Sequence, residues 1–144
     1  MPFTAKLFVD TWGWLALRDR GETRHGDVRR AYEACFARGV RIYTTDYVLD
    51  ETFTLLFLRL PFPEAKASME LLSLGIREGA IISTPITSAR FQDAQVLRLR
   101  YGDKPAISFT DLCSMVVMQE FAITEILTED RHFLQVGLGF QRVP

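Results

Sequence analysis

The sequence contains little cysteine and histidine, with two residues of each type in 144 positions. Cys35 and Cys113 lie far apart, and neither has a further cysteine or a histidine at the spacing of a zinc site. Both lie in apolar periodic stretches, where a free cysteine usually serves as a small core residue. The sequence therefore predicts neither a zinc site nor a disulfide framework, which suits a protein of the reducing cytoplasm. His25 and His132 also have no obvious nucleophile partner, so a Ser–His–Asp mechanism is not indicated. His132 precedes Phe133 in a stretch that we expect to pack against the C-terminal end of the fold rather than to catalyse.

Long hydrophobic runs are missing as well. The apolar stretch near the N-terminus ends at Asp10 and is too short for a signal peptide. No uninterrupted apolar stretch approaches the roughly 18 residues that a membrane helix needs. We therefore expect a soluble, cytoplasmic protein that makes no membrane contact.

The chain also has no excess of either charge, since its formal net charge is −1. No global basic field attracts nucleic acid, which counts against a tight RNA binder but not against an enzyme that engages RNA briefly. Hydrophobic residues make up 48% and charged residues 24% of the sequence, which is ordinary globular usage. Chain length and composition together predict one domain over residues 1–144.

Short apolar runs alternate with amphipathic segments along the chain. We expect strands at 6–9, 41–44, 80–83 and 123–128, with an edge strand in the tail near Phe140 and Val143. Helical periodicity and capping residues predict helices at about 12–18, 27–38, 47–60, 64–77, 88–101 and 111–121, the last of them capped by Thr110. This order predicts an α/β fold, a parallel sheet of four to five strands with helices on both faces.

Four carboxylates stand out by their position in this pattern. Asp10 and Asp130 each follow a predicted strand, and ligands of open α/β sheets bind at the carboxyl ends of the strands. Glu51 lies one turn into a helix, and Asp111 opens the most apolar helix. Three of these acids have an ordinary explanation when taken alone: Asp111 interacts favourably with the helix dipole, Asp130 could begin a turn, and Glu51 could be a solvated helix residue. Asp10 has little local purpose, because it closes a four-residue apolar strand.

Helical geometry distinguishes Glu51 from its neighbour Asp50. Glu51 shares a predicted inward face with Val48, Leu55 and Leu58, whereas Asp50 points elsewhere. A carboxylate on an apolar face is costly unless it is paired or binds a cation. An oxygen-only ligand set favours Mg²⁺ or Mn²⁺ over zinc.

Four segments taken in series resemble the motifs of PIN-domain ribonucleases of the VapC-like kind, the toxins of type II toxin–antitoxin systems. They are FVDT (8–11), YVLDET (47–52), SFTD (108–111) and LTEDRHF (127–133). The resemblance covers essentially the whole chain and implies a three-layer sandwich. It also implies an acidic cluster that binds Mg²⁺ or Mn²⁺ and cleaves RNA. Asp10, Glu51, Asp111 and Asp130 match the acidic quartet, and Thr11 and Thr110 match hydroxyl positions that support it.

The resemblance further implies a cognate antitoxin and a homodimer. Glu129 departs from the family pattern and is either a fifth acid of the site or points away, while Glu125, in a strand expected to be buried, is unexplained. RNA phosphates require cationic contacts, for which the candidates flanking the acidic segments are Arg98, Arg100, Lys104 and Arg131.

Two alternatives remain open at this stage. One is a PIN-fold module that binds RNA or protein without catalysis. The other is a receiver-type phosphorylation switch, which expects a pair of acids after the first strand and a lysine near the end. This chain has Asp10 alone and no lysine after Lys104.

Overall fold

The computed structural model describes residues 5–144. Five strands form one parallel sheet in the order β3-β2-β1-β4-β5. The strands are β1 (Lys6–Val9), β2 (Arg41–Thr45), β3 (Ile81–Thr84), β4 (Glu125–Leu127) and β5 (Gln141–Val143). The predicted parallel sheet is confirmed, including the edge strand in the tail.

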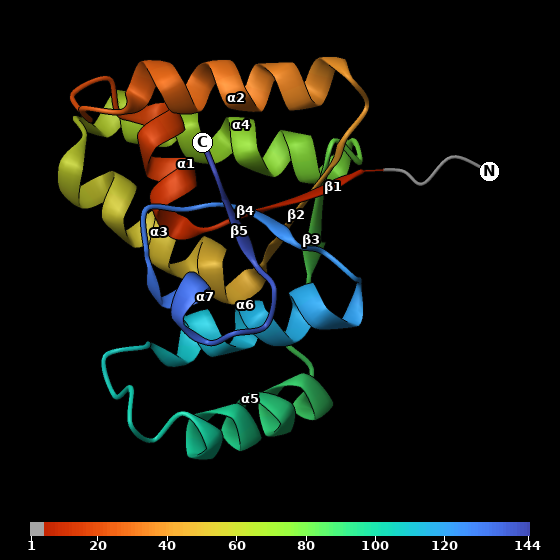
Figure 1. The fold of residues 1–144 in the computed structure, drawn as a ribbon. Helices are drawn as coiled ribbons and strands as arrows, with labels where there is room; N and C mark the ends of the chain where they lie inside the picture. Colours follow the sequence, from red (N-terminus) through yellow and green to blue (C-terminus); the bar gives the residue numbers. More distant parts are fainter. Residues whose placement is uncertain (1–4) are drawn as a thin grey trace.

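Helices cover both faces of this sheet, as predicted. Figure 1 shows α1, α2 and α4 on one side and α5, α6 and α7 on the other. The helix α3 packs against α1 and α4 and also contacts α6. The helices are α1 (Thr11–Arg18), α2 (His25–Ala37), α3 (Asp46–Arg59), α4 (Phe62–Arg77), α5 (Ser88–Arg100), α6 (Phe109–Glu120) and α7 (His132–Gln135). The short helix α7 was not expected from the sequence.

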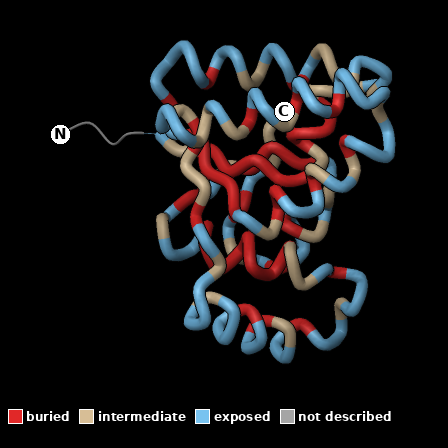
Figure 2. Tube along the Cα trace, turned by 180° about the vertical axis from the view of Figure 1, so that it is seen from behind, coloured by how far each residue is buried: buried red, intermediate tan, exposed pale blue. Residues whose placement is uncertain are grey.

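The central strand β1 and the helix α6 form the middle of the core. Leu7, Phe8 and Val9 are fully buried, because β1 has a strand on each side and helices on both faces. Figure 2 shows buried segments concentrated in this middle region, with exposed helices outside it. All residues of α6 from Asp111 to Met118 are buried, as its apolar sequence predicted.

Side-chain caps fix where two helices of the functional region begin. The Thr45 hydroxyl accepts a 3.1 Å hydrogen bond from Val48 N and starts α3. Ser108, not Thr110 as the sequence suggested, caps α6 and accepts a 3.1 Å hydrogen bond from Asp111 N. The helix therefore begins two residues earlier than expected, and Asp111 lies within its first turn.

Gly13 allows α1 to pack directly against the sheet. A Cβ atom at this position would lie 2.6 Å from the carbonyl oxygen of Leu127 and 2.8 Å from Cγ1 of Val9. Because a side chain has no room here, glycine permits the close approach that holds the start of α1 beside the ends of β1 and β4. None of the helices within residues 5–144 combines the length and the apolar character needed to cross a bilayer.

Candidate active site

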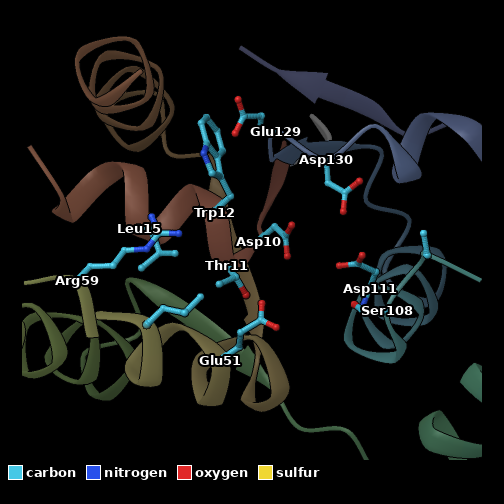
Figure 3. Close-up of a pocket in the computed structure, with 12 residues that line it drawn as sticks. Asp10, Thr11, Trp12, Leu15, Glu51, Arg59, Ser108, Asp111, Glu129 and Asp130 are labelled. Atoms are coloured by element: carbon cyan, nitrogen blue, oxygen red, sulfur yellow. The ribbon is translucent and has the colours of Figure 1, made fainter. Parts of the chain in front are cut away.

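The carboxyl ends of β1 and β4 open into a cleft of about 480 Å³. Asp10 follows β1 and Asp130 follows β4. The two strands are neighbours, with Val9 paired to Leu127, so their ends meet. Figure 3 shows Asp10 between the other acids of this cleft. The residues that line it are Asp10, Thr11, Trp12, Leu15, Glu51, Leu55, Arg59, Ala106, Ser108, Asp111, Glu129 and Asp130.

Glu51 and Asp111 reach the cleft from α3 and α6, so all four acids singled out from the sequence line one cleft. Asp111 is buried, because the Ser108 cap sets the first turn of α6 against the ends of the strands. Glu129, whose direction the sequence left open, also lines the cleft. Glu125, which the sequence placed in a buried strand, is half-buried at the first position of β4.

The predicted inward face of α3 is wrong in part. Leu58 is 75% exposed, and Glu51 itself is exposed, whereas Val48, Thr52 and Leu56 form the buried face. Glu51 therefore stands on the solvent side of the helix, where it faces the open cleft. Asp50 is also exposed but does not line the cleft.

Burial and mutual repulsion raise the pKa values of two of these acids. Desolvation of the deeply buried Asp10 raises its pKa from 3.8 to about 6. Burial, then the charges of Asp10 and Asp130, raise the pKa of Asp111 from 3.8 to about 8. Among residues 5–144, no lysine or arginine forms an ion pair with Asp10, Glu51, Asp111 or Asp130. The described part of the chain therefore offers these carboxylates no lysine or arginine as a counter-ion.

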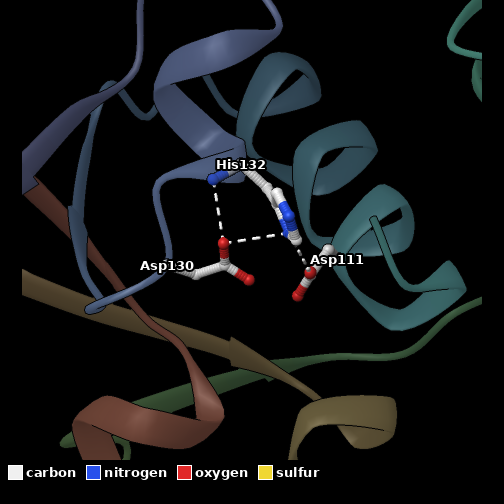
Figure 4. A group of neighbouring side chains, drawn as sticks. All are labelled: Asp111, Asp130 and His132. Atoms are coloured by element: carbon white, nitrogen blue, oxygen red, sulfur yellow. Dashed lines mark hydrogen bonds and ion pairs between the residues drawn. The ribbon is translucent and has the colours of Figure 1, made fainter. Parts of the chain in front are cut away.

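His132 belongs to this cluster, although the sequence-based interpretation assigned it to packing. Its Nδ1 lies 2.9 Å from Oδ1 of Asp130 and 3.8 Å from Oδ2 of Asp111 (Figure 4). The buried packing position belongs to Phe133 instead. The signal in the sequence that could have identified His132 was its position two residues after Asp130. The turn that starts α7 brings the imidazole ring back over the Asp130 carboxylate, and His132 N donates a 2.8 Å hydrogen bond to Asp130 Oδ1.

The potential metal-ligand atoms of this cluster fit a divalent cation. One ligand atom each of Asp111, Asp130 and His132 lie within 4.8 Å of one another. The buried hydroxyl of Thr11 also has no hydrogen-bond partner in the described chain, so a polar atom beside Asp10 is left unsatisfied. Thr110, the other predicted supporting hydroxyl, is half-buried and does not line the cleft.

None of the four basic residues chosen from the sequence as RNA contacts lines the cleft. Arg98 is a structural residue, because its guanidinium donates to the carbonyls of Ile107, Tyr101 and Lys104 and closes the loop after α5. Lys104 pairs with Asp103 at 2.8 Å. Arg100 lines a separate hollow between α5 and α6. Arg131 is exposed next to Asp130 and remains a candidate.

Comparison with known protein families identifies the family of this chain. The sequence matches the family model described as PIN domain over residues 7–138. The chain belongs to the PIN-domain family. The resemblance inferred from the four acidic motifs is thereby confirmed, and the receiver-type alternative is not supported.

Individual PIN-domain relatives agree with this assignment. The 23S rRNA-specific endonuclease VapC20 from two strains of Mycobacterium tuberculosis is 29% identical over 131 residues, which cover 91% of this chain and 94% of the relative. The crystal structure of M. tuberculosis VapC20, described as a sarcin–ricin loop cleaving toxin, superposes with a TM-score of 0.76 and covers 91% of this chain and 95% of that one.

A more distant structure supports the fold. VapBC2 from Rickettsia felis, bound to a DNA fragment from its promoter, is 11% identical with a TM-score of 0.73. The match covers 96% of this chain and 99% of that chain. At this identity the likeness concerns the arrangement of strands and helices alone.

Proposed function

We propose that this PIN-domain protein is a Mg²⁺- or Mn²⁺-dependent endoribonuclease and the toxin of a toxin–antitoxin pair. The observation that carries the proposal is the convergence of Asp10, Glu51, Asp111 and Asp130 on one cleft without a lysine or arginine partner. Crowded carboxylates repel one another, and a shared divalent cation relieves that repulsion. The names of the M. tuberculosis relatives support RNA as the substrate.

In this proposal Asp10, Asp111 and Asp130 hold the ion at the ends of the strands. Glu51, on the opposite wall, orients water or a further ligand at the open side of the cleft. When bound, the ion supplies a water of lowered pKa and offsets negative charge on the phosphate oxygens. The oxygen donors favour Mg²⁺ or Mn²⁺, and the nearby nitrogen of His132 makes Mn²⁺ the better tolerated of the two.

A cognate antitoxin and a homodimer are further parts of the proposal. Leu58 and Phe62 are 75% and 67% exposed, and Phe62 packs on Phe57 with ring centroids 5.7 Å apart. This apolar surface lies on α3 and the start of α4, next to the cleft residue Arg59. Light scattering should show a dimer for the wild type and a shift toward monomer for Phe57→Glu if this surface forms the dimer contact.

The function is tested by incubating the purified chain with a panel of RNAs in Mg²⁺, Mn²⁺ or EDTA. The panel includes a sarcin–ricin loop hairpin, because one relative is described as cleaving that loop. We expect cleavage at defined phosphodiesters with either metal and none in EDTA. RNA binding without cleavage in both metals would instead indicate a non-catalytic PIN-fold binding module.

A further inference from the structure

The cleft has two unlike walls. One wall is acidic, with Asp10, Asp111 and Asp130 around the ends of the strands. The other is formed by Trp12, Leu15, Leu55 and Arg59, with Glu51 and Glu129 at its edges. Figure 3 shows Trp12, Leu15 and Arg59 together on the side away from Asp111. The proposed hydrolysis uses the acidic wall but not the wall formed by Trp12, Leu15, Leu55 and Arg59.

Trp12 is the only aromatic residue among those that line the cleft. It is half-buried, and the guanidinium of Arg24 lies 5.8 Å from the centroid of its ring, a cation–π contact that holds the ring in place. Its Nε1 is buried without a hydrogen-bond partner in the described chain. An unsatisfied buried donor lowers stability, so an indole at this position is poorly explained by folding alone.

Arg59 is the only cation among the residues that line the cleft. Its side chain is 41% exposed, and its only ion pair with residues 5–144 is a 3.6 Å contact with Glu22. A partly exposed, weakly held pair of this kind contributes little to stability, so the guanidinium is available to a ligand. Leu15 and Leu55 add apolar surface to the same lining, and Figure 3 shows Leu15 beside Arg59.

We propose that the wall formed by Trp12, Leu15, Leu55 and Arg59 is a nucleotide subsite for single-stranded RNA. An unpaired base beside the cleaved phosphodiester stacks on Trp12, and Arg59 binds a neighbouring phosphate. The inference rests on the proposed ribonuclease function and refines its substrate class. Stacking on an aromatic ring accepts every base but requires that the base be unpaired and turned outward, which a duplex does not offer.

The test measures binding of a short single-stranded oligoribonucleotide in EDTA at low salt, where metal-dependent cleavage does not occur. RNA should quench tryptophan fluorescence in the wild type. In Trp12→Phe, which leaves only the buried Trp14, the quenching should disappear while most of the affinity remains. Trp12→Ala should weaken binding by about tenfold. A duplex of the same sequence should bind Trp12→Ala and the wild type equally.

Arg59→Gln should weaken RNA binding severalfold. It should also lower the slope of log affinity against log salt concentration by about one. Matched controls are Phe36→Ala and Arg77→Gln, an exposed aromatic and an exposed arginine outside the cleft, which should bind RNA as the wild type does. Thermal melting verifies that each variant is folded. If Trp12→Ala fails to fold, Trp12→Leu and Arg59→Gln still test the subsite.

An abasic nucleotide provides the sharpest readout. Removing the base next to the cleaved bond should weaken RNA binding to the wild type. It should not weaken RNA binding to Trp12→Ala any further, because the stacking partner of the base is already absent. Unchanged RNA affinity in both Trp12→Ala and Arg59→Gln, or an equal loss in the control variants, would overturn the subsite. Trp12-dependent binding by a protein that cleaves no RNA would overturn the nuclease function and leave the subsite standing.

Discussion

The hydroxyl of Thr128 donates a 2.9 Å hydrogen bond to Oδ2 of Asp10, although the two residues are 118 positions apart. The same hydroxyl oxygen accepts a 3.0 Å hydrogen bond from the backbone N–H of Asp130. Thr128 is fully buried. One side chain therefore sets the relative position of the two acids that end β1 and β4.

Thr128→Val should lower RNA cleavage by about tenfold or more, because the isosteric side chain keeps the packing but releases both acids from their common partner. Thr128→Ser keeps the hydroxyl and should retain most activity. The measurement is kcat/KM for a defined RNA, with Mn²⁺ affinity measured in parallel. Equal activity in the valine and wild-type proteins would show that Asp10 and Asp130 need no such link.

The raised pKa values of Asp10 and Asp111 predict an unusual dependence of stability on pH. Above about pH 4 the unfolded chain has released protons that the folded protein still holds, so unfolding releases protons. The free energy of unfolding from these two groups should fall as pH rises, through about pH 6 for Asp10 and about pH 8 for Asp111. Chemical unfolding in EDTA at several pH values measures this slope.

Asp111→Asn removes the group with the larger shift and serves as the matched variant. It should flatten the slope between about pH 6 and pH 8 and raise the melting temperature in EDTA at the upper end of that range. Divalent metal should stabilise the wild type more at pH 8 than at pH 6, because fewer protons must then be displaced. A lower melting temperature of the variant at pH 8 would mean that Asp111 acts as a structural residue.

Gly13→Ala should destabilise the protein by about 1–3 kcal/mol, because the added Cβ would overlap the Leu127 carbonyl and the Val9 side chain. The shift of α1 should also disturb Asp10, so cleavage should fall with stability. Gly26→Ala is the control within α2, where the nearest atoms belong to the flexible end of Arg30. That change should be neutral or stabilise by about 0.5–1 kcal/mol. If Gly13→Ala and Gly26→Ala have the same free energy of unfolding, the close packing of α1 against the sheet is not required for stability.

The sequence predicted the sheet well, because strand residues such as Leu7 and Phe8 form short apolar runs between helices of regular period. The acids at strand ends could also be found, since the carboxyl ends of parallel strands meet. The cap of α6 was misplaced, because Ser108 and Thr110 are both suitable hydroxyl residues and only the backbone conformation chooses between them.

Side-chain partners that depend on loop conformation or on contacts between distant segments could not be predicted. Arg98 was chosen as an RNA contact because it precedes an acidic segment, but its guanidinium satisfies carbonyls of its own loop. His132 depends on the turn into α7, and Thr128 depends on the pairing of β1 with β4. The roles of Arg98 and His132 thus follow from the local backbone conformation, and the role of Thr128 follows from a contact between distant strands.

The most direct test of the proposed active site compares two neighbouring acids of α3. Glu51 and Asp50 are both exposed on the same helix, but only Glu51 lines the cleft with Asp10, Asp111 and Asp130. We predict that Glu51→Gln lowers Mg²⁺- or Mn²⁺-dependent cleavage by about a hundredfold or more while the protein stays folded. The same loss is expected for Asp10→Asn, Asp111→Asn and Asp130→Asn. Asp50→Asn should stay within a few-fold of the wild type. An essential Asp50 with a dispensable Glu51 would contradict the assignment of the cleft as the active site.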